Sequence, residues 1–292
     1  MDIEMIAATH SGKFHADDVL AWALLVEFYP AELSLLRTRI EKEIENADIV
    51  FDVGGDYNPS TKRFDHHQQS YQGNYSSAGM VLDWLHQKQY IDTQLFQNLK
   101  TSIVRYVDDV DNGRILPNEE VPCFPIIVDS FNHGCTTLEE FDNGFHQASK
   151  IAKTFIQQLK KKIQQEKEAE TLVLQAMEKS TVQNSNIIEL PRYLPWKSIY
   201  FSNGGKTHHT EYVIFPTLHK TWQAVAIPPE EQSFAQKRSF PASWAGLRDN
   251  ELSKAIGVEG AIFCHKNRFV AVFTNRNSLL SAMKQFNLIH SI

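Results

Sequence analysis

The sequence predicts an α/β fold in which a mainly parallel sheet flanked by helices precedes a long helix and a smaller α+β C-terminal lobe. Three observations predict it. Short apolar runs alternate with helical segments in the first third of the chain, which is typical of parallel strands joined by crossover helices. Apolar residues then recur at helical spacing from Phe141 to Met177. The last third returns to short β-like runs and one terminal helix.

The first elements alternate between strand and helix. The apolar run from Ile3 to Thr9 is expected to form a strand. Residues 16–28 are apolar almost all round and contain neither Gly nor Pro, which predicts a buried helix. Two further strands are expected at 33–38 and 48–53, joined by a polar helical segment at 39–46. Strands separated by helices favour parallel pairing with both faces of the sheet covered.

Two more helices are expected before the chain becomes irregular. Ser76 or Ser77 is a suitable cap for a helix that continues through His86. Another helix is expected from Thr93 to about Val110. Residues 118–132 contain two prolines and are expected to be irregular.

A long amphipathic helix is expected over about 141–180, because apolar residues recur there with gaps of three or four. The stripe consists of Phe141, Phe145, Ala148, Ala152, Phe155, Leu159 and Ile163. A polar break at 183–186 then separates two expected domains, 1–182 and 187–292. In the second domain, β-like runs are expected at 198–201, 212–216, 222–227, 260–264 and 268–273, with a closing helix at 279–285.

The composition excludes several classes of protein. Of 292 residues, 42% are apolar and 22% charged, which excludes a largely disordered chain. The 29 basic and 35 acidic residues give a net charge of −6, which argues against non-specific coating of duplex DNA but permits a local basic groove. Three scattered cysteines are expected to be reduced thiols, and no secretory signal or long apolar span is recognisable. We therefore expect a cytoplasmic protein without a membrane segment.

Ionisable side chains gather in four short segments, several of them at the ends of expected strands. The segments are His10 to Asp18, Asp52 to Asp56, Asp65 to His67, and Asp108 to Gly113. The carboxyl ends of strands are where open α/β sheets bind ligands, so the first two segments should converge. Neighbouring carboxylates cannot all stay ionised without a cation, and Asp and His together suit a divalent first-row metal. The segments predict one or two divalent ions, Mn first, with Mg and Zn as alternatives.

Each segment also has a structural interpretation. A single Asp at a strand end more often caps a helix or forms a turn. Asp17 and Asp18 would suit the first turn of a helix through the macrodipole in any case. The pair His208-His209 is assigned no role, and Asp56 to Pro59 is expected to form a turn. The co-occurrence of all four segments between His10 and Gly113 nevertheless favours metal binding.

Four motifs carry a resemblance to a known superfamily. In chain order they are HSGKFHADD, DVGG, RFDHHQ followed by SSAG, and DDVDNG. With them the chain resembles the DHH phosphoesterase superfamily and, more narrowly, its Myg-type branch, the melanocyte-proliferating-gene family of metal-dependent hydrolases and exonucleases. The similarity continues through LPRYLPWK, SWAGLRDNELSKAIGVEGAIFCH and the closing segment. It implies a DHH-type lobe that carries the metals and a C-terminal lobe that closes over the substrate.

The resemblance also implies roles for individual residues. The implied metal ligands are His10, His15, Asp17, Asp52, His66 and Asp108, with Asp111 as the competing choice for the last position. The implied catalytic residues are Asp52, which would bridge two ions, His67, which would face the phosphate, and Asp65, which would ligate or orient through a hydrogen bond. The superfamily more commonly has an Asp where this chain has His15, which makes the binding softer.

Two arginines of the second domain are candidate substrate-binding residues. Arg248 and Arg276 can each hold a phosphate, although an ion pair with Asp249 or Glu251 is the alternative for Arg248. Members of the family have Gly-Gly-His after the aromatic of the last strand, where this chain has Ala271-Val272-Phe273. The replacement implies a shifted substrate choice or a low activity.

The sequence therefore predicts a metal-dependent phosphoesterase, in the form of a nuclease or exonuclease on RNA or short oligonucleotides, with two-metal activation of water. The expected partners are a phosphate-containing small molecule or short single-stranded RNA or DNA, and no membrane. The long helix can form the seam of a homodimer, although packing on its own lobes explains the stripe equally well. The alternative function is a metal-containing nucleotide-binding or regulatory protein with reduced or no turnover. Proteolysis is disfavoured because no HExxH motif occurs.

Overall fold

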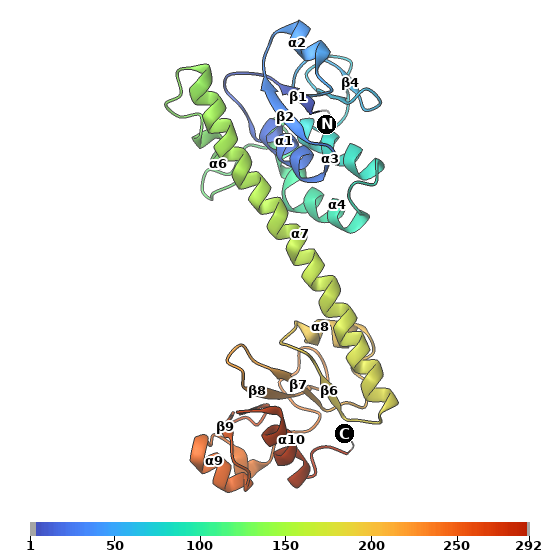
Figure 1. Ribbon diagram of the computed structural model, residues 1–292, viewed down its shortest axis with the longest axis vertical. Coiled ribbons are helices and arrows are strands. Elements are labelled where there is room, and N and C mark those ends of the chain that lie inside the picture. Colours follow the sequence, from blue (N-terminus) through green and yellow to red (C-terminus); the bar gives the residue numbers. More distant parts are fainter. Residues whose placement is uncertain (1–3, 291–292) are drawn as a thin grey trace. The chain divides into compact units, whose positions relative to one another are not determined.

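A five-stranded sheet forms the centre of each of two units in the computed structural model, which describes residues 4–290 (Figure 1). The units comprise residues 1–163 and 164–292. Within the described residues, none of the helices combines the length and apolar composition that a bilayer crossing requires. The three cysteines are free.

The sheet of the first unit is mainly parallel, with strand order β2-β1-β3-β5-β4. Its strands are β1 (Met5–Thr9), β2 (Leu33–Arg37), β3 (Ile49–Phe51), β4 (Tyr57–Asn58) and β5 (Arg63–Phe64). Strand β1 pairs in parallel with β2 and β3, β3 pairs in parallel with β5, and β4 is antiparallel to β5. The expected α/β class is confirmed. The start of the first expected strand, Ile3, lies outside the described residues.

Helices cover the two faces of this sheet unequally. They are α1 (Ala16–Phe28), α2 (Glu41–Asn46), α3 (Ser77–Gln87), α4 (Thr93–Leu99), α5 (Arg105–Asp111) and α6 (Phe124–Ser130). Helices α1 and α3 pack against each other in the main core, and α1 is buried from Ala16 to Leu25, as its apolar sequence predicts. On the opposite face the small side chains of Ala8, Ala47 and Val50 form a separate cluster beside α2.

Two segments of the first unit differ from the sequence-based expectation. The helix expected over 93–110 is interrupted by a π-helical turn, Lys100–Val104, between α4 and α5. The segment expected to be irregular contains α6, which has Pro125 in its first turn. Proline is tolerated there because the first amides of a helix have no intrahelical acceptor. The prolines therefore marked the start of a helix rather than its absence.

The expected long helix is α7 (Leu138–Val182). Phe145, Ala148 and Ile163 are buried in the core of the first unit, as the stripe predicts. Phe155 is 41% exposed, however, and its neighbour Ile156 is fully buried. The stripe therefore passes through Ile156, and the gaps from Ala152 through Ile156 and Leu159 to Ile163 are four, three and four, which is also helical spacing.

The second unit has an α+β architecture with strand order β6-β7-β8-β10-β9. Its strands are β6 (Ile187–Glu189), β7 (Tyr212–Pro216), β8 (Trp222–Ala226), β9 (Ala261–Cys264) and β10 (Val270–Phe273). Its helices are α8 (Trp196–Ser202), α9 (Asp249–Ile256) and α10 (Arg276–Gln285), with a 3₁₀ turn at Ala242–Trp244. The sheet is antiparallel apart from the β6–β7 pair. The expected α+β class of this lobe is therefore confirmed.

The strand expected at 198–201 is wrong, because these residues belong to α8. Their aromatic and β-branched side chains favour a strand locally. Helical spacing instead brings Trp196 and Tyr200, four residues apart, into contact with ring centroids separated by 6.1 Å, and both are buried in the same cluster. Tertiary burial therefore overrides the local preference.

Candidate metal centre

Side chains from three neighbouring elements meet at the carboxyl-terminal edge of the first sheet. His10 follows β1 and Asp52 follows β3, while Asp17 and Asp18 lie in the first turn of α1. Strands β1 and β3 are parallel neighbours, so their ends reach the same edge. All four side chains are buried, and both aspartates of α1 are 0% exposed. The convergence expected for the first two segments of the sequence therefore occurs.

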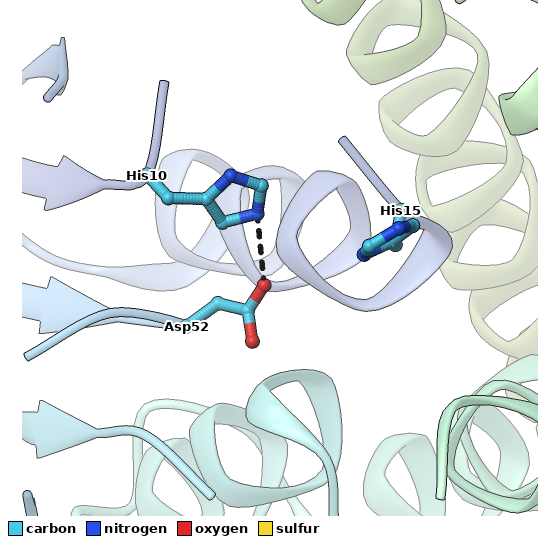
Figure 2. Close-up of side chains that lie close together, drawn as sticks. All are labelled: His10, His15 and Asp52. Carbon is cyan, nitrogen blue, oxygen red and sulfur yellow. Dashed lines mark ion pairs between the residues drawn. The ribbon is translucent and has the colours of Figure 1, made fainter. Parts of the chain in front are cut away.

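Asp52 lies between two histidines. Figure 2 shows the ring of His10 directed at the Asp52 carboxylate, with His15 beyond it at the start of α1. Nε2 of His10 lies 3.2 Å from Oδ2 of Asp52, and Nε2 of His66 lies 3.4 Å from Oδ1. Each carboxylate oxygen of Asp52 therefore faces a different imidazole.

The backbone of Asp52 has a conformation that sequence patterns do not reveal. Its φ is +56°, in the left-handed region that few residues other than glycine adopt. Asp and Asn tolerate this region better than other side chains because they form local hydrogen bonds. Strand β3 ends at Phe51, so the reversal at Asp52 occurs where the chain leaves the sheet.

His66 also contacts the acidic residues on the other side of the cluster. Its Nε2 lies 3.2 Å from Oδ2 of Asp111 and 3.9 Å from Oδ2 of Asp17. His15, Asp17 and Asp111 offer ligand atoms within 4.8 Å of one another. The same limit encloses His10, His15 and Asp52; Asp52, His66 and His67; and Asp17, Asp18 and Asp52. The groups overlap, so they form one continuous cluster.

The pKa shifts in the cluster show that its buried carboxylates are stabilised by positive charge. Burial opposes the charged form of His10, but the hydrogen bonds that its ring donates to Asp18 and Asp52 overcome this effect and raise its pKa to about 10. Burial, together with the charges of Asp52 and Asp111, raises the pKa of Asp17 well above its ordinary value. Without a cation, the cluster therefore retains a proton on His10 at neutral pH, and ionisation of Asp17 is opposed.

Unpaired buried atoms test whether a cation fits. Both carboxylate oxygens of Asp17 have no hydrogen-bond partner among the described residues. A buried polar group without a hydrogen-bond partner lowers the stability of the folded state by about 1–3 kcal/mol, and a charged carboxylate lowers it by more. A divalent cation would satisfy these atoms, and a mixture of carboxylate and imidazole donors suits a first-row metal. The residues present therefore fit a metal ion.

Asp108 and Asp111 occupy different environments. Oδ1 of Asp108 accepts hydrogen bonds from the amide of Ser76 at 2.9 Å, its hydroxyl at 2.7 Å and the amide of Gly79 at 3.1 Å. Asp108 thus caps the start of α3, which the sequence analysis assigned to a serine side chain. The absence of a side chain at Gly79 permits this contact, because a Cβ there would lie 2.5 Å from Oδ2 of Asp108. Of the two aspartates, only Asp111 takes part in the groups of possible ligands.

Asp65 and His67 form a hydrogen-bonded pair at the edge of the cluster. Nδ1 of His67 lies 2.7 Å from Oδ1 of Asp65, and the Asp65 carboxylate also accepts from the amides of Gly55 and His67. Asp65 is buried, whereas the His67 side chain is 63% exposed. Of the two roles considered for Asp65, this geometry fits orientation of a neighbour through a hydrogen bond.

Three residues near the cluster were not singled out as site residues from the sequence. Asp18 caps α1 through Oδ1, which accepts from the His15 amide at 2.9 Å, while Oδ2 lies 3.2 Å from Nε2 of His10. Nη2 of Arg39 lies 3.2 Å from Nδ1 of the same ring. The hydroxyl of Ser77 donates to Oδ1 of Asp52 at 3.1 Å. The adjacent Asp-Asp pair for Asp18 and the SSAG motif for Ser77 were local signals, whereas no motif marked Arg39.

The two candidate arginines belong to the second unit. Nε and Nη2 of Arg276 donate to the two carboxylate oxygens of Glu189 at 2.6 and 2.7 Å. The Arg248 guanidinium lies 5.2 Å from the centroid of the Phe263 ring. Among the described residues, Arg248 forms no ion pair with Asp249 or Glu251.

Comparisons with known proteins give consistent matches over nearly the whole chain. The family model MYG1_exonuc, "Uncharacterised protein family (UPF0160)", matches residues 6–286. "MYG1 protein" of Chlamydia muridarum is 37% identical over 288 residues, which are 97% of this chain and 96% of that protein. "MYG1 exonuclease" of Homo sapiens is 30% identical over 317 residues, covering 94% and 83% of the two chains. The solved structure "Crystal structure of exonuclease RecJ bound to manganese" covers 96% of this chain and 88% of its own, with 13% identity and a TM-score of 0.25, a similarity too low to transfer any property.

Proposed function

The chain belongs to the MYG1_exonuc family, and on that premise we propose that it is a metal-dependent phosphodiesterase that removes nucleotides from RNA or short oligonucleotides. Relatives in Homo sapiens and Rattus norvegicus are named exonucleases, which supports hydrolysis of a nucleic acid. The observation that carries the proposal is the buried cluster in which Asp52 lies between His10 and His66 while Asp17 has no hydrogen-bond partner.

The metal ligands in this proposal come from all four segments. They are His10, His15, Asp17, Asp52, His66 and Asp111, with Asp108 as the cap of α3 instead. When bound, a pair of divalent ions lowers the pKa of water and neutralises negative charge on the phosphoryl oxygens. Manganese is the first choice because it accepts both carboxylate and imidazole ligands. Asp52 would be the shared ligand, a role supported by the different histidine that each of its oxygens faces.

His67 and Asp65 act on the substrate side of the cluster. Asp65 holds the imidazole of His67 through Nδ1, and this hydrogen bond raises the pKa of His67. The His67 side chain is 63% exposed, so in its protonated form the ring can donate Nε2–H to a phosphate oxygen. His67 thus binds and orients the phosphate, and Asp65 positions His67.

The substitution Asp52→Asn tests this assignment. It removes one charge at nearly constant volume, and Asn tolerates the left-handed backbone of this position, so the variant should fold. With Mn²⁺, we expect hydrolysis of bis(p-nitrophenyl) phosphate and of a labelled RNA 10-mer to fall at least about 100-fold, together with the bound-metal content.

Asp56→Asn is the matched control, because it removes the same charge from an exposed position four residues away. It should retain wild-type rates. EDTA should abolish hydrolysis, and added Mn²⁺ should restore it. Normal turnover by Asp52→Asn, or hydrolysis that survives chelation, would refute the proposal.

A metal-containing nucleotide-binding protein with reduced or no turnover is the second candidate. The observation that favours it is the interior position of β10, in which Ala271 and Phe273 are both 0% exposed where the resemblance expects Gly-Gly-His. Glycines would let backbone amides approach a phosphate, whereas these side chains fill a core. Tight oligonucleotide binding with no hydrolysis in Mn, Mg, Zn, Ni or Co would establish this candidate instead.

A further inference from the structure

A second cavity of the first unit lies outside the metal cluster. It has a volume of about 630 Å³, within the range of pockets that hold small organic ligands. Its distinctive lining residues are three tyrosines and three cations: Tyr57, Tyr71, Tyr75, Lys100, Arg105 and Arg114. We call it the tyrosine–arginine pocket. Nothing in the roles discussed above accounts for this combination.

Positive charge in the pocket is only partly neutralised. Arg114 is paired with Asp109 at 2.7 Å and donates to the carbonyl of Asn74. The side chain of Lys100 donates only to the Tyr75 hydroxyl, at 3.3 Å. Arg105 is exposed, and its guanidinium forms no hydrogen bond or ion pair with residues 4–290. Two carboxylates, Asp108 and Asp109, also line the pocket, but Asp108 is engaged by Ser76 and Gly79, so the local balance of three cations and two acids favours an anion.

The tyrosines provide half-buried aromatic faces beside these cations. The rings of Tyr57 and Tyr71 meet edge to face with centroids 5.4 Å apart, and the Tyr71 hydroxyl accepts from the Tyr75 amide at 3.2 Å. The three rings are therefore held in place by contacts within the protein. Aromatic faces next to a phosphate-binding cation are the features that single-stranded nucleic acids use, through stacked bases and bound phosphates.

The π-helical turn determines where the two least neutralised cations lie. Lys100 is its first residue, and Arg105 directly follows it. Such turns are rare in helices and are frequent at functional sites, because they change the direction of the following side chains. The backbone irregularity therefore coincides with the lining of the pocket.

The pocket and the metal cluster flank the same helix terminus. Asp108, which also lines the pocket, accepts from Ser76 at the start of α3. The next residue, Ser77, donates to Asp52 in the metal cluster at 3.1 Å. Two consecutive residues at the start of α3, Ser76 and Ser77, therefore contact one residue of the pocket lining and one residue of the metal cluster.

We propose that the tyrosine–arginine pocket binds one nucleotide of a single-stranded nucleic acid, with its phosphate on Arg105 and Lys100 and its base against the tyrosines. The inference rests on the proposed function in one respect, namely that a neighbouring phosphodiester of the same strand is the one hydrolysed. Binding in the pocket itself requires no metal ion, so the two proposals can be tested separately.

The test measures binding of a fluorescein-labelled single-stranded RNA 8-mer to the full chain by fluorescence anisotropy. EDTA is present, so cleavage does not contribute. Arg105→Gln should raise the Kd about tenfold, because it removes one charge-assisted phosphate contact. The matched control is Lys150→Gln, which removes one positive charge from an exposed position on α7 and should change the Kd less than twofold.

Competition experiments test the aromatic part of the pocket. Adenosine monophosphate should displace the 8-mer at a concentration at least about tenfold lower than inorganic phosphate does, because only the nucleotide stacks on the tyrosines. Equal displacement by both compounds would overturn the base contact, and equal effects of the Arg105 and Lys150 variants would overturn the pocket. A wild-type chain that does not bind the 8-mer would overturn it as well.

Hydrolysis of bis(p-nitrophenyl) phosphate by the wild-type chain separates this inference from the proposed function. Suppose that the chain does not hydrolyse the diester, and that Arg105→Gln still weakens RNA binding. The inference about the pocket is then supported, and the proposed hydrolase function is refuted. If the chain hydrolyses the diester but Arg105→Gln binds RNA normally, the pocket fails and the hydrolase stands.

Discussion

Two aspartates of α5 have different roles because different parts of the chain lie beside them. Asp111 and Asp108 are three residues apart on α5, yet one lies beside His66 and the other caps α3. Residues three apart on a helix share a face only approximately, so a small rotation of the helix decides which one reaches a given site. Local sequence therefore cannot choose between them.

Paired substitutions of the two aspartates are expected to separate their roles. Asp108→Asn preserves an acceptor for the amides of Ser76 and Gly79, so it should keep bound metal and hydrolysis within about threefold of wild type. Asp111→Asn removes a charged ligand atom and should lower Mn²⁺ affinity about 10- to 100-fold. Metal titration and turnover of both variants check this, and the reverse order of effects would assign the ligand to Asp108.

Metal affinity is expected to depend on pH through the same residues. Without metal, His10 has a pKa of about 10 and holds a proton near pH 7, and the pKa of Asp17 is raised by burial and by neighbouring carboxylates, which favours its protonated form. Ligands must lose these protons when a cation binds, so a higher pH favours binding. The apparent Mn²⁺ affinity should therefore rise steadily from pH 6 to pH 8 in a competitive titration with a chelating dye. An affinity independent of pH would mean that neither residue is a ligand.

At the scale of an element, the position of strand β10 inside the sheet explains the residues found at 271–273. Strand β10 lies between β8 and β9, and Ala271 and Phe273 point into the core of the second unit. The Phe273 ring contacts Trp244 with centroids 6.1 Å apart. The residues that replace Gly-Gly-His therefore also contribute to the hydrophobic core of the second unit.

A triple substitution in β10 is expected to destabilise the second unit. Phe273→His with Ala271→Gly and Val272→Gly removes a fully buried ring and should lower the free energy of unfolding by at least about 3 kcal/mol. Urea denaturation measures the effect. Phe234→His is the control, because Phe234 is 99% exposed and the change should stay within about 0.5 kcal/mol. A triple variant as stable as wild type would show that the strand is not packed as described.

At the scale of the whole molecule, the candidate metal ligands and the candidate phosphate-binding arginines lie in different units. Every candidate metal ligand lies between His10 and Asp111, within the unit that ends at residue 163. The candidate phosphate contacts Arg248 and Arg276 lie in the other unit. A cytoplasmic location, a homodimer through α7 and the domain limits 1–182 and 187–292 stay predictions.

A fragment of residues 1–163 is expected to bind Mn²⁺ with an affinity within about threefold of the full chain, because it contains all the ligands and its own hydrophobic core. A fragment of residues 164–292 should bind none. Circular dichroism establishes that each fragment is folded, and isothermal titration measures the binding. A folded first fragment that binds no metal would place essential ligands elsewhere.

The sequence by itself determined the α/β class, the buried helix α1, the long helix and the four segments that supply the cluster, because periodicity and motif spacing are local properties of the chain. Only the tertiary structure decided that Asp111 lies beside His66 while Asp108 caps α3, that Asp18 contacts His10, and that residues 198–201 form a helix. These outcomes depend on the rotation and burial of whole elements against one another, and residues far apart in the chain contribute to that packing energy.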